Sequence, residues 1–324
     1  LLWIIGSLSS LSGLTGIPLH FLFKIPFILA DLGIGCLIYR IILNQNGTKK
    51  VAVFLASLFL LNPLPILISG YQGQLDSLLI FLVLLSSYVL VSTRKITLLV
   101  VATAGLLLGI SCTVKLVPFG LLPIFLLYLF RSEKLMKKSL VQKSLLLFLF
   151  TLLTFLPLIL EFIPYLSVWN AIVEHVFQYK TWWSLWGVSL LLRKLNEIWF
   201  SSSGWFSEII AVSKNQTLSV VLVLLISYIV VFLKKWSLTK SILFVFMTEY
   251  AISSFLAPQY LIWILPFFIL EYSKSGKFLY SYIAYSILTF LAASTIYLFW
   301  QDETIFQYLG NLLKITDIAG FGFN

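Results

Sequence analysis

The sequence predicts an all-α, polytopic helical membrane protein with about ten visible transmembrane helices. Of its 324 residues, 60% are hydrophobic and only 10% are charged, and the mean hydropathy is +1.03. A water-soluble core does not require so much apolar surface. Apolar runs such as 96–112 and 144–160 carry no charge over roughly the 20 residues that cross a bilayer. They also lack the alternation of polar and apolar residues that is typical of barrel strands.

Ten apolar stretches are candidates for spanning helices, and no linker, low-complexity tract or evident internal repeat divides them. In chain order they are 21–43, 51–69, 77–91, 96–112, 116–130, 144–165, 218–233, 241–256, 259–271 and 278–300. We therefore expect a single transmembrane domain over 1–324, with one long loop at 166–217.

The loops between these stretches alternate in charge. One set is short and basic and, with Arg40, holds 15 of the 22 Lys and Arg residues. This set comprises 44–50, 92–95, 131–143, 234–240 and 271–277. Cytoplasmic loops carry an excess of Lys and Arg, so we expect this set on the cytoplasmic side. The net charge of +10 then reflects topology, and we expect no nucleic-acid partner.

The start of the chain falls in the opposite, non-cytoplasmic set. Residues 1–20 begin with Leu and continue into a Ser-rich segment that is typical of the membrane interface. We expect at least one further helix upstream of Leu1, with a processed signal sequence as the alternative.

The non-cytoplasmic loop 166–217 holds six of the ten tryptophans. Within it, 188–195 predicts a short interfacial amphipathic helix that carries Arg193 and Lys194. Tryptophans sit well at the level of lipid headgroups, and they also stack on sugar rings. Each is therefore either part of an aromatic belt or a binding residue, and the length of the loop favours function. The tryptophans that we single out for stacking are Trp182, Trp183 and Trp186.

A polar segment lies where the second and third apolar stretches meet. It ends in a Gly-Gln-Leu-Asp tetrad, Gly73–Asp76. A carboxylate at the start of a helix is a suitable cap, so Asp76 either caps the next helix or joins Gln74 in a polar site. Lys115, at the end of the fourth stretch, either snorkels to the interface or binds a lipid phosphate as a point charge.

Other polar residues also lie at membrane depth, where a charge is costly and usually faces a cavity or a partner. Lys24 and Asp31 are seven residues apart and so share one helix face. Asp31 is either a packing partner or a functional group. The short stretch at 259–271 is preceded by Pro258 and interrupted by Pro266. A broken helix of this kind predicts a wall of a wet cavity.

With these residues the chain resembles the polyprenyl-phosphate-sugar-dependent glycosyltransferases of the GT-C superfamily. It looks most similar to bacterial polyprenyl-phosphate-mannose mannosyltransferases and to glycosylphosphatidylinositol (GPI) mannosyltransferases. The stretches that carry the resemblance are Phe23–Asp31, Asn62–Asp76, Gly109–Lys115 with Pro118 and Pro123, Ala257–Pro266, and the loop Tyr179–Gly187.

The resemblance implies a GT-C-like fold and an integral membrane hexosyltransferase. Such an enzyme moves a hexose, for which we expect mannose, from a polyprenyl phosphate to a glycan or glycolipid acceptor on the non-cytoplasmic face. The membrane would be the plasma (inner) membrane in a bacterium and the endoplasmic reticulum in a eukaryote. The superfamily's catalytic acid lies in the first non-cytoplasmic loop, which we expect upstream of Leu1, since 1–20 contains no Asp or Glu. Asp76 is the candidate within the chain.

The resemblance also suggests roles for the other polar residues. Lys115 is the first candidate for binding the donor phosphate, followed by Arg193 and Lys194. We expect no metal or other cofactor, because the polyprenyl-phosphate sugar is a co-substrate that is already activated. The expected partners are this donor, the acceptor and the membrane lipids. Besides the three loop tryptophans, the residues expected to line the substrate cavity are Lys24, Asp31, Gln74, Gln259, Tyr260 and Trp263.

Three alternatives remain open at this point. A secondary transporter or a flippase for lipid-linked glycans also has broken helices and buried charges. An envelope polysaccharide polymerase or ligase has a similar polytopic sequence, but an arginine-rich loop would be expected, and 166–217 contains Arg193 alone. A non-catalytic membrane scaffold would need no acid.

Overall fold

The computed structural model describes residues 2–135, 139–168, 187–200, 204–214, 216–252, 258–273 and 278–299. Within these ranges every regular element is a helix. The elements up to the long loop are α1 (Leu2–Thr15), α2 (Leu19–Asn44), α3 (Lys49–Leu60), α4 (Pro63–Pro65), the π-helix η1 (Ile66–Gln72), α5 (Asp76–Ser92), α6 (Leu98–Val114), the 3-10 helix η2 (Val117–Leu121), α7 (Leu122–Arg131), η3 (Glu133–Leu135), α8 (Leu140–Phe162) and η4 (Ile163–Val168).

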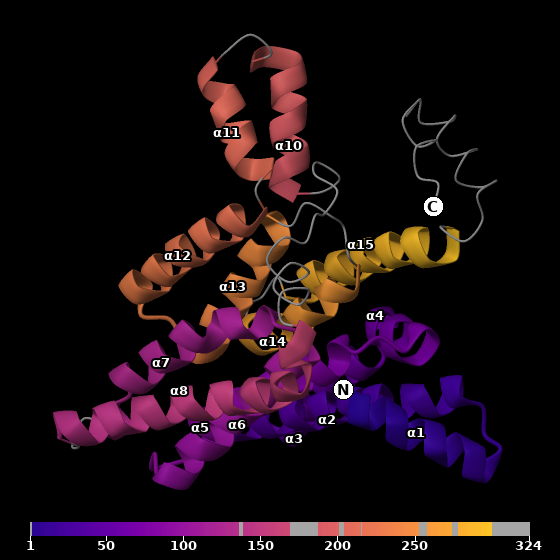
Figure 1. Ribbon diagram of the computed structural model, residues 1–324, viewed down its shortest axis with the longest axis vertical. Helices are drawn as coiled ribbons and strands as arrows, with labels where there is room; N and C mark the ends of the chain where they lie inside the picture. Colours follow the sequence, from indigo (N-terminus) through magenta and orange to yellow (C-terminus); the bar gives the residue numbers. More distant parts are fainter. Residues whose placement is uncertain are drawn as a thin grey trace.

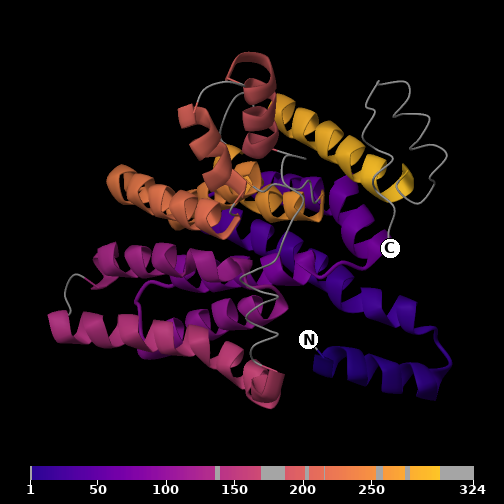
Figure 2. The same cartoon turned by 45° about the horizontal axis from the view of Figure 1, so that its top comes forward.

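The remaining elements begin in the long loop. They are α10 (Gly187–Leu195), η5 (Asn196–Phe200), α11 (Gly204–Lys214), α12 (Gln216–Lys234), α13 (Leu238–Ile252), the 3-10 turn η6 (Pro258–Tyr260), α14 (Leu261–Tyr272) and α15 (Phe278–Phe299). In Figures 1 and 2, α10 and α11 stand together at the top; α10 contacts α13, and α11 contacts α12.

Each of the ten predicted spans holds helical residues, so the all-helical class is confirmed. Three helical segments among the described residues are long and apolar enough to cross a membrane, namely 19–44, 49–72 and 140–167. Shorter apolar helices occupy other predicted ranges. Large apolar side chains are exposed on the outer faces of α2, α3, α6, α8 and α12, as lipid contact requires.

The helices pack in two connected groups. In the first, α3, α2, α5, α6 and α8 follow one another side by side, and in the second α12 packs on α13 and α13 on α14 (Figure 1). The helix α14 joins the groups because it contacts α2, α3, α5 and α13. Nearly all of its residues are buried, which agrees with its apolar character on every side.

The α6–α8 pair is close because two glycines of α6 face α8. A β-carbon at Gly105 would lie 2.8 Å from the Phe150 carbonyl oxygen, and one at Gly109 would lie 2.5 Å from that of Thr154. This four-residue spacing of small residues is the pattern that lets membrane helices approach each other. The Thr154 hydroxyl also donates to the Gly105 carbonyl at 3.3 Å.

The predicted span 51–69 is not one continuous α-helix. Helix α3 ends at Leu60, and the buried Asn62 caps α4 by accepting the Leu64 N–H at 2.9 Å. The Asn62 amide donates to Tyr282 and Ser286 of α15 at 2.9 and 2.8 Å. Proline at 63 cannot donate the hydrogen bond that would continue the helix. The chain therefore turns here and enters η1.

The basic loops meet at one end of the bundle. The Lys134 ammonium donates to the Val91 carbonyl at the end of α5 at 2.9 Å. The Arg131 guanidinium donates to the Phe232 carbonyl near the end of α12 at 2.5 Å, and the Thr239 hydroxyl donates to Glu271. We call this the basic end. Because α5 runs from Asp76 to Ser92, Asp76 lies at the opposite end.

Candidate functional site

The centre of the candidate site is an ion pair between two helix ends. Asp76 is the first residue of α5, and Lys115 follows the last residue of α6 in an extended conformation. The Lys115 ammonium donates to both carboxylate oxygens of Asp76, at 2.8 and 2.9 Å. The cap of α5 is Leu75, and no side chain caps this helix. Asp76 therefore binds a cation instead of capping its own helix, and Lys115 points to a partner and does not snorkel.

Two aromatic side chains from the start of α14 complete the cluster. The Trp263 indole donates to Asp76 Oδ1 at 2.8 Å. The Tyr260 ring stacks on the Trp263 ring with centroids 4.3 Å apart. The Lys115 ammonium lies 5.0 Å from the Tyr260 centroid and 5.7 Å from that of Trp263, within the range of cation–π attraction. Three of the polar stretches singled out in the sequence therefore meet at one place.

Within this cluster Asp76 and Trp263 are buried, whereas Lys115 and Tyr260 are partly exposed. The Asp76 side chain is fully buried, whereas a quarter of the Lys115 side chain is exposed. Both oxygens of Asp76 already accept hydrogen bonds from Lys115, and Oδ1 accepts a further one from Trp263. An incoming group would meet the Lys115 ammonium and the neighbouring rings, with Asp76 behind them.

Helix α2 places Lys24 and Asp31 against the same turn of chain. The stem of Lys24 lies beside Gly73, and its ammonium is 6.0 Å from the Tyr71 ring centroid. Asp31 is 8% exposed, and its Oδ1 has no hydrogen-bond partner. The hydroxyls of Ser69 and Ser77 interact with this carboxyl, and they bond to each other at 2.6 Å.

The turn between η1 and α5 depends on Gly73, which has a φ of +68°. Its conformation lets the Gln74 N–H donate to the Ile68 carbonyl at 2.9 Å. A β-carbon at Gly73 would lie 3.2 Å from Cγ of Lys24. The turn therefore requires both a left-handed backbone and a close approach to α2.

We expect Gly73→Ala to destabilise the protein by about 1–2 kcal/mol, because an L side chain is disfavoured in the left-handed region. Thermal unfolding of the purified protein in detergent measures this effect. Gly70→Ala is the matched control, since Gly70 lies in η1, three residues before Gly73, with no atom within 4 Å of its β-carbon position. Equal midpoints for the two variants would contradict the prediction.

Other predicted site residues lie elsewhere. Arg193 and Lys194 pair with Glu197 at 3.6 and 2.7 Å on α10 and η5, not with Asp76. The hydrogen bond from Lys194 lowers the pKa of the exposed Glu197 carboxyl. Half-buried Gln74 and Gln259 lie in the turns before α5 and α14. The candidates Trp182, Trp183 and Trp186 fall outside the described residues.

Sequence reasoning missed the serines that face Asp31. Ser69 lies in η1 and Ser77 in α5, and both are buried. Neither α-helical nor strand periodicity brings together two residues eight apart across a π-helix and a left-handed turn. The one signal in the sequence is that both serines flank the polar segment. The proline at 266 also differs from expectation, because α14 continues through it.

An apolar groove runs beside the same helix. It has a volume of about 440 Å³ and lies between α10, α13, α14 and α15. Leu261 and Ile264 of α14, which flank Trp263, are two of its lining residues, and Met247 and Phe268 are others. The groove and the ion pair therefore share one wall, α14.

The family of this chain is shown by the part of its sequence that runs from residue 7 to residue 208. A family model described as "GPI transamidase subunit PIG-U" matches residues 7–208, which is more than half of the 324 residues. The chain belongs to the PIG-U family. The matched region includes Asp31, Asp76 and Lys115, whereas Tyr260 and Trp263 lie beyond it.

This PIG-U family member is also similar to proteins named GPI mannosyltransferase 1. It is 32% identical over 111 residues to the one from Candida albicans and 35% identical over 95 residues to the one from Saccharomyces cerevisiae. These matches cover 34% and 29% of this chain and 26% and 22% of the relatives. The chain thus spans about a quarter of the length of the curated relatives that it matches.

These relatives confirm the resemblance to GPI mannosyltransferases, which are GT-C glycosyltransferases. No solved structure matches the chain.

Proposed function

We propose that this PIG-U family member is an integral membrane mannosyltransferase that transfers mannose from a polyprenyl-phosphate carrier to a GPI-type glycolipid acceptor. The similarity to proteins named GPI mannosyltransferase 1 supports the sugar and the acceptor. The observation that carries the proposal is the partly exposed Lys115 ammonium, which is held by buried Asp76 and flanked by two aromatic rings.

In the proposed reaction an acceptor hydroxyl attacks the anomeric carbon of the donor sugar. The new bond joins the acceptor oxygen to that carbon, and the bond from the carbon to the phosphate oxygen breaks. Its electron pair leaves with the polyprenyl phosphate, so negative charge grows on the phosphate. A fixed cation at that place stabilises the transition state more than the ground state. Lys115 supplies this cation.

Asp76 acts in this proposal by positioning Lys115. A carboxylate whose two oxygens already accept three hydrogen bonds is poorly placed to take a proton from an acceptor. The proposal therefore assigns the proton of the acceptor hydroxyl to a base other than Asp76. No metal is required, because the phosphate ester is already an activated leaving group.

The apolar groove is where we place the hydrocarbon chain of the donor. The groove shares α14 with the ion pair, and its lining is almost entirely apolar. A polyprenyl chain in the groove would bring its phosphate toward Lys115. The Tyr260 ring beside the ammonium then offers a stacking surface to the sugar.

The two ends of the bundle support a non-cytoplasmic site in this proposal. The positive-inside rule favours the cytoplasm for the basic end, and the ion pair lies at the opposite end. In a eukaryote that membrane is the endoplasmic reticulum, which the GPI mannosyltransferase relatives support.

A transfer assay tests the function. The full-length protein in lipid nanodiscs is incubated with radiolabelled polyprenyl-phosphate mannose and a GPI precursor. We expect label in the precursor and a much slower reaction with polyprenyl-phosphate glucose. Labelled acceptor that forms equally fast without the protein, or no transfer at all, would contradict the proposal.

A second candidate function is a non-catalytic subunit that binds the GPI glycolipid. The description of the family as a transamidase subunit supports it, as does the full engagement of the Asp76 carboxylate. This candidate predicts saturable binding of the GPI precursor without transfer in the same assay. The assay separates the two candidate functions. Both use Lys115 to bind phosphate, but only the mannosyltransferase consumes the polyprenyl-phosphate mannose.

A further inference from the structure

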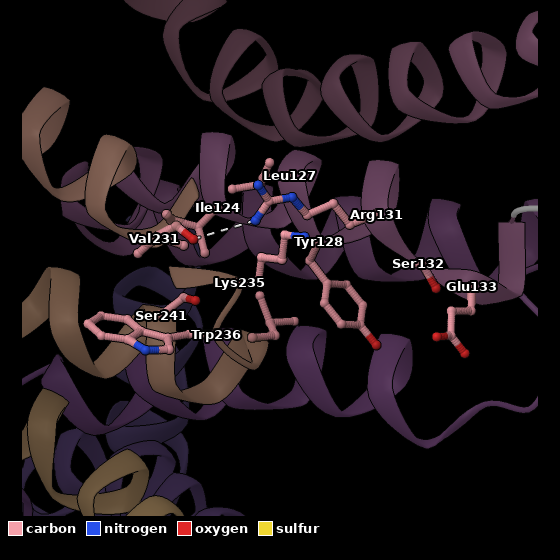
Figure 3. A pocket seen from close by; sticks show the side chains of 11 residues that line it. Ile124, Leu127, Tyr128, Arg131, Ser132, Glu133, Val231, Lys235, Trp236 and Ser241 are labelled. Carbon is pink, nitrogen blue, oxygen red and sulfur yellow. Dashed lines mark hydrogen bonds between the residues drawn. The ribbon is translucent and has the colours of Figure 1, made fainter. Parts of the chain in front are cut away.

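A second pocket lies at the basic end, far from the ion pair. It has a volume of about 590 Å³ and lies between α7, η3, α12 and α13. Its charged lining residues are Arg131, Lys235 and Glu133. Figure 3 draws Glu133 and Trp236 at opposite edges of the pocket, with the side chains of Arg131 and Lys235 next to each other between them. The two cations therefore share one part of the pocket, and the acid lies apart from them.

The Arg131 guanidinium is held in place by hydrogen bonds that use only some of its N–H donors. It donates to the carbonyls of Val231 and Phe232 at 3.5 and 2.5 Å and lies 4.4 Å from the Phe232 ring centroid. A guanidinium has five N–H donors, so most of them remain for another acceptor. In Figure 3 this group points into the pocket.

Lys235 reaches the same pocket through an unusual backbone. Its φ is +51°, a left-handed conformation that costs energy for a residue with a β-carbon. The Lys235 N–H donates to the Val231 carbonyl at 3.2 Å and closes α12. Strained non-glycine residues of this kind cluster at functional sites.

No carboxylate among the described residues forms an ion pair with Arg131 or Lys235. The nearby Glu271 is instead bound by the hydroxyls of Ser237 and Thr239. Lys240 lies over the Trp236 ring at 4.9 Å and Lys134 caps α5, so further positive charge surrounds the pocket. Two cations without an acid between them favour an anionic ligand.

The rest of the lining is suited to a lipid. Ile124 and Leu127 of α7 and Leu238 of α13 are apolar lining residues, and Ser241 adds a hydroxyl group. Outside the pocket, Phe130 and Phe232 are each 55% exposed on the bundle surface. Charged groups at the end of apolar helices meet the headgroup layer of a bilayer.

We propose that this pocket binds the phosphate of an anionic membrane lipid through Arg131 and Lys235, with the lipid tails along α7 and α12. This site is independent of the proposed transferase activity, because it lies at the other end of the bundle and shares no residue with it. Phosphate is the recognised chemistry, and the lipid is favoured over a soluble phosphate by the apolar lining residues and the exposed aromatic rings.

The test measures lipid retention by native mass spectrometry. The full-length protein is taken from nanodiscs that contain phosphatidylcholine with phosphatidic acid or phosphatidylinositol. We expect the double variant Arg131→Gln/Lys235→Gln to lose retained anionic lipid by about fivefold for each charge removed. Arg94→Gln/Lys95→Gln is the control, because both side chains are exposed at the same end outside the pocket.

Lys235→Gly is a second variant for the case in which loss of Arg131 unfolds the protein, because it removes one pocket cation and leaves Arg131 in place. Glycine accepts the left-handed backbone without strain, so this variant should fold normally and still retain less anionic lipid. Equal retention in the pocket and control variants would overturn the proposal. Displacement of the lipid by soluble inositol phosphate at equal concentration would overturn the assignment to a lipid.

Discussion

Lys115→Ala should lower mannosyl transfer by roughly 100-fold or more, the size of effect expected when one fixed transition-state donor is lost. The variant removes the only part of the Asp76–Lys115 pair that an incoming phosphate can reach, since Asp76 is fully buried. The rate of label transfer to the acceptor under saturating donor measures the effect. Lys115→Arg should retain more activity, because the cation survives in altered geometry.

Lys95→Ala is the matched control for this loss. It removes the same charge from an exposed residue near the basic end, so its activity should equal that of the unaltered protein. Binding of the GPI precursor should weaken in Lys115→Ala even if no transfer is ever detected, which keeps the prediction informative for a binding subunit. Unchanged transfer and unchanged binding would remove Lys115 from the site.

Asp76→Ala should be the most destabilising change at the site, by about 3–5 kcal/mol, because it leaves the Lys115 cation without its partner in a largely buried place. It also leaves the Trp263 indole without its acceptor. The apparent midpoint of thermal unfolding in detergent measures this effect. The unfolding midpoint of Asp76→Asn should lie between those of Asp76→Ala and the unaltered protein, because the amide oxygen of Asn can still accept the indole N–H.

The double variant Asp76→Ala/Lys115→Ala makes the test sharper. Since it removes the stranded charge as well, it should be more stable than Asp76→Ala alone. A double variant at least as destabilised as the sum of the single changes would show that the two side chains do not interact. A pair that is structural only would show this stability pattern while Lys115→Ala kept full activity.

The helices could be predicted from the sequence because apolar runs of this length have few alternatives in a membrane. The site residues could also be predicted in part, since polar groups at membrane depth are rare and stand out. Asp76 and Lys115 stand out in this way, whereas Tyr260 and Trp263 are expected at the site because the stretch Ala257–Pro266 resembles the superfamily. What the sequence did not reveal is that they bind one another.

That pairing depends on how far each helix extends, which apolar patterns do not determine. Asp76 and Lys115 meet because α5 begins and α6 ends at the same level. The two helices pack directly on each other, and the Ser86 hydroxyl of α5 donates to the Ala104 carbonyl of α6 at 2.7 Å. By contrast, the pairing of Lys194 with Glu197 could have been found from their spacing, because residues three apart on a helix are neighbours. The break at Asn62 depends on α15, more than 200 residues later in the chain.

The indole that covers the ion pair comes from far along the chain, since Trp263 and Asp76 are 187 residues apart. A ribosome adds about 5–20 residues per second, so Asp76 and Lys115 wait on the order of ten seconds or longer for α14 to be synthesised. During this interval the two helix ends must remain together in the membrane, or stay exposed to the insertion machinery and its chaperones. The site is thus completed late in biogenesis, because the Trp263 indole can cover the ion pair only after α14 has been inserted.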